Sequence, residues 1–139
     1  MEKQALEMLT PVAPAFIGDA VHTLYIRRRI VESGQSAGTL HLLCSKFVNA
    51  KAQAKVFDEL SGRGEFSDEE AEIARRAKNA HLHSRAKTAS PEDYHKATAL
   101  EAVIGYLELS GNAARRDYIL DKCAEVSGLN EYLSEKIQK

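Results

Sequence analysis

Two acidic residues of this chain lie inside apolar runs, where an ionised side chain is costly. Asp19 interrupts the run 16–21 (FIGDAV), and Glu101 interrupts the run 99–105 (ALEAVIG). At helical spacing both acids have apolar neighbours within one turn, so both are expected at or near the packed side of a helix. Residues of this type, held so close to a core, are candidates for chemistry rather than for solubility.

Two carboxylates that face each other repel unless a cation lies between them. A hard, oxygen-seeking ion such as Mg²⁺ meets that need, usually through one or two carboxylates and several waters, and it also promotes phosphodiester hydrolysis. Gly18 and Gly105 favour this arrangement, because residues without a Cβ let two helix backbones approach closely. In the alternative, each acid pairs with an arginine or accepts a backbone hydrogen bond; spacing alone leaves both interpretations open.

A basic segment lies between the two acids along the chain. No acidic residue occurs between Glu72 and Glu92, whereas the stretch 75–90 (RRAKNAHLHSRAKTAS) is rich in arginine and lysine. It begins on a predicted helix and continues into the small polar residues typical of a loop. Such a segment attracts phosphates without distinguishing bases, and the scarcity of aromatic residues favours a duplex backbone over stacked single strands. The alternative is a solvated basic loop without a ligand.

The elements that must position these residues are predicted to be helices, so the fold class is all-α. Start signals are clear: Ser67 and Glu70 form a capping box, and Ser90 precedes Pro91 at a helix start. No alternating strand of convincing length is found. Pattern counting gives five to seven helices, and the bounded ones span 15–33, 37–61, 69–80, 91–110 and 113–127, with a short terminal helix after Gly128.

The bulk properties restrict the function classes. The 139 residues fit one domain, 1–139, and the net charge of −1 means that any nucleic-acid binding depends on local charge. No signal segment or apolar run of ~20 residues is present, which favours a cytoplasmic protein and no membrane contact. Cys44 and Cys123 are expected to be inert buried residues, and no Gly-rich phosphate loop indicates a nucleotide cofactor. A lone Glu92-x-x-His95 cannot supply a di-iron site, which needs two such motifs.

Four segments, in order, resemble the ribonuclease III family. The string FIGDAVHTLYIRR (16–28) resembles the family's LGDAV-type helix with its metal-binding aspartate, and YHKATALEAVIGYLELSG (94–111) resembles the second signature helix with its metal-binding glutamate. Between them, VNAKAQA (48–54) and RRAKNA (75–80) resemble segments of Mini-III, the short branch without an appended double-stranded RNA-binding domain. Each segment alone is weak, but the combination is specific.

The resemblance implies a ribonuclease III catalytic-domain helical bundle that acts as a homodimer. It implies that Asp19 and Glu101 are catalytic and bind Mg²⁺, for which Mn²⁺ can substitute, in an endoribonuclease that hydrolyses double-stranded RNA. The implied substrate is precursor ribosomal RNA, and each subunit would cut one strand. Since no extra RNA-binding domain is present, the basic segment takes over that work, and the expected RNA-binding residues are Arg75, Arg76, Lys78, Asn79, Arg85 and Lys87.

The chain departs from longer relatives at Val12, Ala15 and Thr98, where those relatives carry acids. The resemblance therefore implies one firmly held ion with a large share of water ligands. His22, one turn from Asp19, either orients that acid or is structural. Two other functions stay open: a catalytically silent RNA-binding dimer of the same fold, which would have no reason to keep both acids, and an all-helical partner-binding module without RNA affinity.

Overall fold

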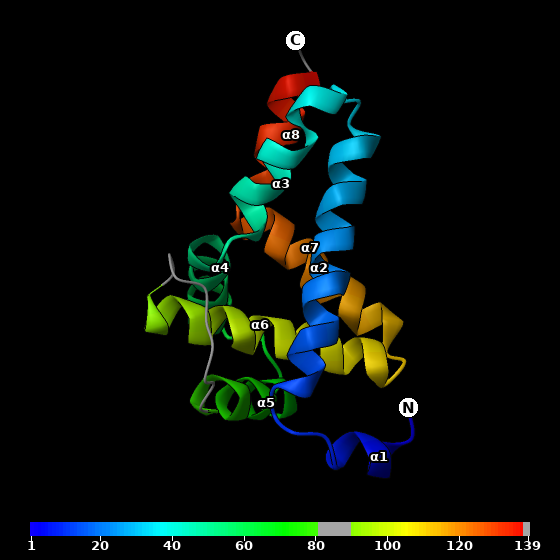
Figure 1. Cartoon of the computed structure of the whole chain (residues 1–139), viewed down its shortest axis with the longest axis vertical. Helices are drawn as coiled ribbons and strands as arrows, with labels where there is room; N and C mark the ends of the chain where they lie inside the picture. Colours follow the sequence, from blue (N-terminus) through cyan, green and yellow to red (C-terminus); the bar gives the residue numbers. More distant parts are fainter. Residues whose placement is uncertain (81–89, 138–139) are drawn as a thin grey trace.

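The computed structural model describes residues 1–80 and 90–137, and all regular structure within them is helical, as predicted (Figure 1). No helix in these ranges is both long enough and apolar enough to cross a membrane. The elements are α1 (Lys3–Glu7), α2 (Ala13–Glu32), a 3₁₀ helix η1 (Ala37–Thr39), α3 (Leu40–Val48), α4 (Ala50–Gly62), α5 (Asp68–Asn79), α6 (Pro91–Leu109), α7 (Ala113–Val126) and α8 (Leu129–Ile137).

The predicted start signals are confirmed at α5 and α6. Ser67 accepts a hydrogen bond from the Glu70 amide at 3.1 Å while the Glu70 carboxylate accepts one from the Ser67 amide at 2.9 Å, so both halves of the capping box are present. Ser90 caps α6 by accepting from the amide of Asp93 at 3.1 Å. The helices predicted over 15–33, 69–80, 91–110 and 113–127, and the terminal one, correspond to α2, α5, α6, α7 and α8.

The single helix predicted over 37–61 is wrong. The backbone is extended at Asn49 (φ −85°, ψ 160°), whose side chain accepts a hydrogen bond from the Ala52 amide at 2.8 Å and so caps α4. The break has a packing reason, since Phe47 of α3 packs beside α2 and α8, whereas Phe57 of α4 packs against α6. The prediction also missed α1, so the described residues form more helices than expected.

Helix α6 lies at the centre of the fold and contacts α2, α4, α5 and α7 (Figure 1). Most residues in its middle are completely buried, as expected for a helix covered on several sides. A second group of core residues packs the C-terminal half of α2 against α3 and α8. Cys44 and Cys123 are buried and free, as predicted. The fully buried α6 residues include Ala99, Leu100, Val103 and Ile104.

Helices α2 and α6 cross where two glycines meet. A Cβ atom added to Gly18 would lie 1.7 Å from the carbonyl oxygen of Glu101, and one added to Gly105 would lie 1.7 Å from that of Pro14. The predicted close approach is therefore confirmed, and only glycine allows it at either position. Because Asp19 follows Gly18 and Glu101 lies one turn before Gly105, this crossing sets the separation of the two acids.

Candidate active site

The two acids meet in a cleft of ≈ 450 Å³ formed by α2, α4 and the first turns of α6. Their side chains lie close enough for the negative charge of Asp19 to raise the pKa of Glu101. Asp19 comes from α2 and Glu101 from α6, so residues separated by more than half of the chain reach the same cleft. The other lining residues are Val12, Ala15, Phe16, Ala50, Gln53, Tyr94, Ala97 and Thr98.

The two acids differ in exposure, which corrects one expectation. Glu101 is partly buried, as predicted, but Asp19 is exposed rather than packed. The buried face of α2 near the crossing carries Pro14, Gly18 and His22 at four-residue spacing, so Asp19 lies one step around the helix, at the mouth of the cleft. The apolar neighbours of Asp19 in sequence therefore did not imply burial.

Burial raises the pKa of Glu101 to about 8, and the nearby negative charge and hydrogen bond of Asp19 raise it further in the same direction. Near neutral pH and without a cation, Glu101 therefore keeps its proton. Within residues 1–80 and 90–135, whose side chains the structure describes, no ion pair joins either acid to an arginine or lysine. The alternative of structural arginine pairs thus finds no support in the described part of the chain.

The donor set fits a hard divalent ion. Two carboxyl groups line the cleft, and Mg²⁺ commonly binds proteins through one or two carboxylates. The cleft also has room for several water molecules at about 30 Å³ each. Among the described residues no group of three or more His, Cys, Asp or Glu side chains could hold a metal. Water must therefore supply most of the ligands of any ion bound here.

The three positions where longer relatives carry acids supply no carboxylate. Val12 and Ala15 line the cleft with apolar side chains. Thr98 also lines it, and its hydroxyl donates to the carbonyl oxygen of Tyr94 at 2.8 Å. This agrees with a site that has few protein ligands.

Two buried polar residues beside the acids are His22 and Gln53, with 2% and 3% of their surface exposed. The Gln53 Nε2 and the His22 Nδ1 are 3.0 Å apart. Burial lowers the pKa of His22 to about 4, although the negative charge of Asp19 opposes this, so the ring is neutral near pH 7. Gln53 lines the same cleft as Glu101 and lowers the pKa of that carboxyl. Sequence reasoning missed Gln53, and its signal was a polar residue three to four positions before Val56 and Phe57 on the apolar face of α4.

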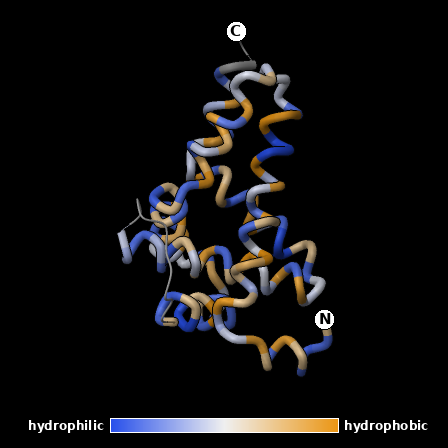
Figure 2. The backbone as a smooth tube through the Cα atoms, viewed as in Figure 1, coloured by the Kyte–Doolittle hydropathy of each residue, from blue (hydrophilic) through white to orange (hydrophobic). Residues whose placement is uncertain are grey.

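Of the residues expected to bind RNA, four lie at the C-terminal end of α5, within the helix predicted over 69–80: Arg75, Arg76, Lys78 and Asn79. Most of α5 is hydrophilic, which Figure 2 shows as blue. Arg76 and Asn79 are exposed and Lys78 is partly exposed, whereas Arg75 pairs with Glu72 at 2.7 Å. Arg85 and Lys87 lie outside the described residues.

The basic end of α5 adjoins the cleft. Ala77, between Arg76 and Lys78, is buried in a small cluster with Ala15 of α2 and Ala102 of α6. Ala15 also lines the cleft, and Ala102 follows Glu101. The end of α5 that carries Arg76 and Lys78 is therefore one packing layer from the acids.

Comparisons with known proteins agree with this geometry. The ribonuclease III domain family matches residues 13–112, which include α2 to α6 and both acids. A Mini-ribonuclease 3 of Staphylococcus aureus is 38% identical over 118 residues, covering 84% of this chain and 88% of that protein. A Mini-ribonuclease 3 of Thermoanaerobacter sp. is 38% identical over 131 residues, covering 91% of this chain and 88% of its own length.

A solved structure has the same fold. The X-ray structure of a protein from Fusobacterium nucleatum superposes with a TM-score of 0.73 at 29% identity, covering 81% of this chain and 90% of that one. Family match, relatives and fold thus converge on the segments that carry Asp19 and Glu101. The chain therefore belongs to the ribonuclease III family, in its Mini-ribonuclease 3 branch.

Proposed function

We propose that this Mini-ribonuclease 3, a double-strand-specific endoribonuclease, hydrolyses RNA phosphodiester bonds at the cleft with Asp19 and Glu101 as its catalytic metal ligands. The observation that carries the proposal is that two carboxyls line one cleft, close enough for the charge of one to shift the pKa of the other, without a cationic side chain paired to either in the described ranges. Mg²⁺, or Mn²⁺ in its place, would supply a Lewis acid that polarises the phosphate and lowers the pKa of a bound water.

The protein's own contribution is to hold the two carboxyls at a fixed separation. Gly18 and Gly105 fix it through the backbone contact of α2 with α6. Glu101 gives up its proton when the site is loaded, because a carboxylate rather than a carboxylic acid is the ligand for a hard cation. Because Glu101 is partly buried, few water molecules surround its carboxylate, and the lower local dielectric constant strengthens its attraction to a cation.

For RNA binding we propose the basic end of α5, with Arg76, Lys78 and Asn79 as the principal contacts and Arg75 as a further one. Support comes from their exposure and from the packing that joins this end of α5 to the cleft. Arg75 would exchange its Glu72 partner for a phosphate, since that pair is more than half exposed on both sides and so is weak. Arg85 and Lys87 belong to the same proposal on sequence grounds.

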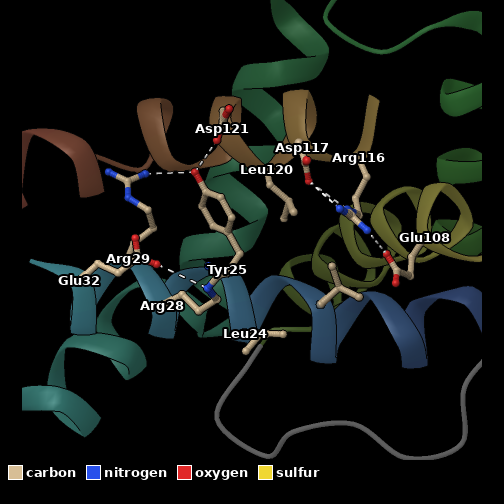
Figure 3. A pocket seen from close by; sticks show the side chains of 11 residues that line it. Leu24, Tyr25, Arg28, Arg29, Glu32, Glu108, Arg116, Asp117, Leu120 and Asp121 are labelled. Atoms are coloured by element: carbon tan, nitrogen blue, oxygen red, sulfur yellow. Dashed lines mark hydrogen bonds and ion pairs between the residues drawn. The ribbon is translucent and has the colours of Figure 1, made fainter. Parts of the chain in front are cut away.

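We propose that the active form is a homodimer that uses the exposed face of α2. Phe16, Leu24 and Val31 lie at near-helical spacing on this helix and are 83%, 60% and 60% exposed. Figure 3 shows Leu24 at the edge of a groove of ≈ 440 Å³ between α2 and α7, where Leu120 lies inside a rim of charged side chains. Phe16 also lines the cleft, so a dimer through this face would bring two clefts near its axis, one for each strand.

The natural substrate that we propose is precursor ribosomal RNA, with action in the cytoplasm by residues 1–139 as one catalytic domain. The resemblance to the Mini-III branch supports this assignment. The second candidate is a catalytically silent RNA-binding dimer with the same fold. The proximity of Asp19 and Glu101 in one cleft favours the enzyme, because a silent protein gains nothing from holding a second carboxyl beside the first.

The test is cleavage of a long RNA duplex with and without Mg²⁺ by the wild-type chain, Asp19→Asn and Glu101→Gln. Either substitution should lower the rate by at least about 10³-fold, which corresponds to several kcal/mol of lost transition-state stabilisation, while leaving metal-free duplex binding intact. Glu131→Gln, which alters an exposed acid on α8, is the control and should cleave normally. Cleavage that survives both site substitutions refutes the assignment, and uncut RNA with the wild-type chain favours the silent dimer.

The dimer is tested by sedimentation of the wild-type chain and Leu24→Glu. Wild-type protein at micromolar concentration should sediment at twice the chain mass, and Leu24→Glu should sediment as a monomer because it places a charge in the apolar face. Leu42→Glu, which alters an exposed leucine of α3, is the matched control. A wild-type monomer at all concentrations would contradict the proposal.

A further inference from the structure

Gln53 is a polar side chain buried in the wall of the cleft, on α4 and between α2 and α6. A buried amide costs free energy unless its hydrogen-bonding groups have partners. In the described part of the chain no buried side-chain nitrogen or oxygen lacks a partner. The amide of Gln53 is therefore part of a satisfied network and not an accident of packing.

The hydrogen bonds of Gln53 define one orientation of its amide. The amide nitrogen can only donate, so at 3.0 Å the His22 Nδ1 accepts, which places the ring proton on Nε2. The same NH₂ group carries a second N–H. Gln53 and Glu101 line the same cleft, and the Gln53 amide lowers the pKa of the Glu101 carboxyl, which is the effect of a donor near a carboxylate. Both partners thus fit the same placement of nitrogen and oxygen.

His22 is a rigid anchor for this amide. Its ring is almost completely buried on α2, four residues after Gly18 and on the same buried face. A ring enclosed in this way cannot move aside to release the amide. The hydrogen bond between His22 and Gln53 consequently connects α2 to α4 in the wall of the cleft that Glu101 of α6 also lines.

We propose that Gln53 is a positioning residue of the metal centre: its amide, held by His22, directs the carboxyl of Glu101 toward Asp19. The inference rests on the proposed function, since it assumes that the two acids hold the ion. Gln53 would contact a ligand of the metal rather than the metal itself. Loss of such an outer partner typically weakens metal binding 10–100-fold.

The test is metal affinity in Gln53→Met, which keeps the side-chain length and removes both N–H donors. Titration calorimetry with Mn²⁺ and RNA-free protein should show binding weakened by about 10–100-fold, and half-maximal cleavage should require correspondingly more Mg²⁺. Duplex affinity without divalent ions should stay at the wild-type value, and the rate at saturating Mg²⁺ should return to within about tenfold. Lys55→Met, exposed on the same helix, is the control and should bind Mn²⁺ normally.

A second variant, His22→Phe, releases the amide while preserving a buried ring. It should weaken Mn²⁺ binding in the same direction, and the double variant should be no weaker than Gln53→Met alone, because both changes break one chain of contacts. If Gln53→Met does not fold, His22→Phe decides the question by the same Mn²⁺ titration.

The outcomes separate this inference from the proposed function. A folded Gln53→Met that binds Mn²⁺ like the wild type, or that loses only thermal stability, overturns the positioning role. If Asp19→Asn and Glu101→Gln abolish Mn²⁺ binding in that same experiment, the proposed function stands and only this inference fails. If neither acid variant affects Mn²⁺ binding, the metal site itself has been misassigned.

Discussion

Replacing Gly18 by alanine tests whether the backbone contact between α2 and α6 sets the geometry of the site. The new Cβ would lie 1.7 Å from the Glu101 carbonyl oxygen, whereas ordinary contact begins at 3.4 Å, so the helices must separate by about 1.7 Å. The obstacle is backbone and cannot rotate away. Overpacking of this kind costs about 1–3 kcal/mol, and we expect the upper end of that range, partly offset by the better helix propensity of alanine.

Two assays measure the consequences of Gly18→Ala. Thermal unfolding should show a decrease in melting temperature on the order of 10 °C. Mg²⁺-dependent cleavage of duplex RNA, measured well below that temperature, should fall by about 10²-fold, because a shift of ~1 Å at reacting groups has an effect of that size.

The control for this prediction is Gly62→Ala, at the end of α4, where no atom lies within 4 Å of the added Cβ. This variant should keep its activity and unfold at or slightly above the wild-type temperature. A Gly18→Ala protein with wild-type melting temperature and wild-type rate would refute the reasoning, since it would mean that α2 and α6 need not touch for the acids to work.

Three further predictions concern stability. Without metal, the raised pKa of Glu101 means that its protonated carboxyl contributes fully to the free energy of unfolding below about pH 4.5, and that this contribution is lost as the pH rises through 8. The stability of Glu101→Gln relative to the wild type, measured by denaturant unfolding, should therefore rise by up to about 1.4 kcal/mol per pH unit across that window. An equal stability difference at pH 5 and pH 9 would contradict this. Arg115→Ala should lower the free energy of unfolding by about 3 kcal/mol, because it leaves the buried Glu70 carboxylate without its two 2.9 Å hydrogen bonds from Arg115. Arg28→Ala, which breaks an exposed ion pair with Glu32, should lower it by less than about 1 kcal/mol. Ser67→Ala should lower the melting temperature, because it removes the N-cap hydrogen bond of α5, which contributes about 1 kcal/mol to stability. An unchanged melting temperature would show that the capping box does not stabilise the fold.

Local signals predicted most of the fold. Ser67, Ser90 and the residues after them define helix starts by hydrogen bonds within one turn, and such bonds depend on neighbours in sequence. Asn49 carries the same kind of signal, yet apolar periodicity continues through it, so one helix was predicted where two exist. The direction of the chain changes there because α3 and α4 pack on different partners, which local sequence does not encode.

The site was predictable in its acids but not in their surroundings. Asp19, Glu101 and the neighbouring glycines are marked by residue type, and the structure brings all of them to one helix crossing. Exposure of Asp19 was mispredicted because helical phase relative to α6 decides it, not the apolar character of adjacent residues. The hydrogen bond between Gln53 and His22 joins residues 31 positions apart, on α4 and α2. These helices come together because both pack on α6, which local sequence does not encode.

The most direct test of the central claim is an anomalous-scattering map from crystals of the protein grown with Mn²⁺. We expect one strong peak per subunit in the cleft, within about 2.0–2.3 Å of a carboxylate oxygen of Asp19 or Glu101, with the other acid bound directly or through one water. The peak should vanish in Glu101→Gln crystals. A peak at other acids, or none in the cleft at saturating Mn²⁺, would contradict the assignment of these two residues as the metal-binding pair.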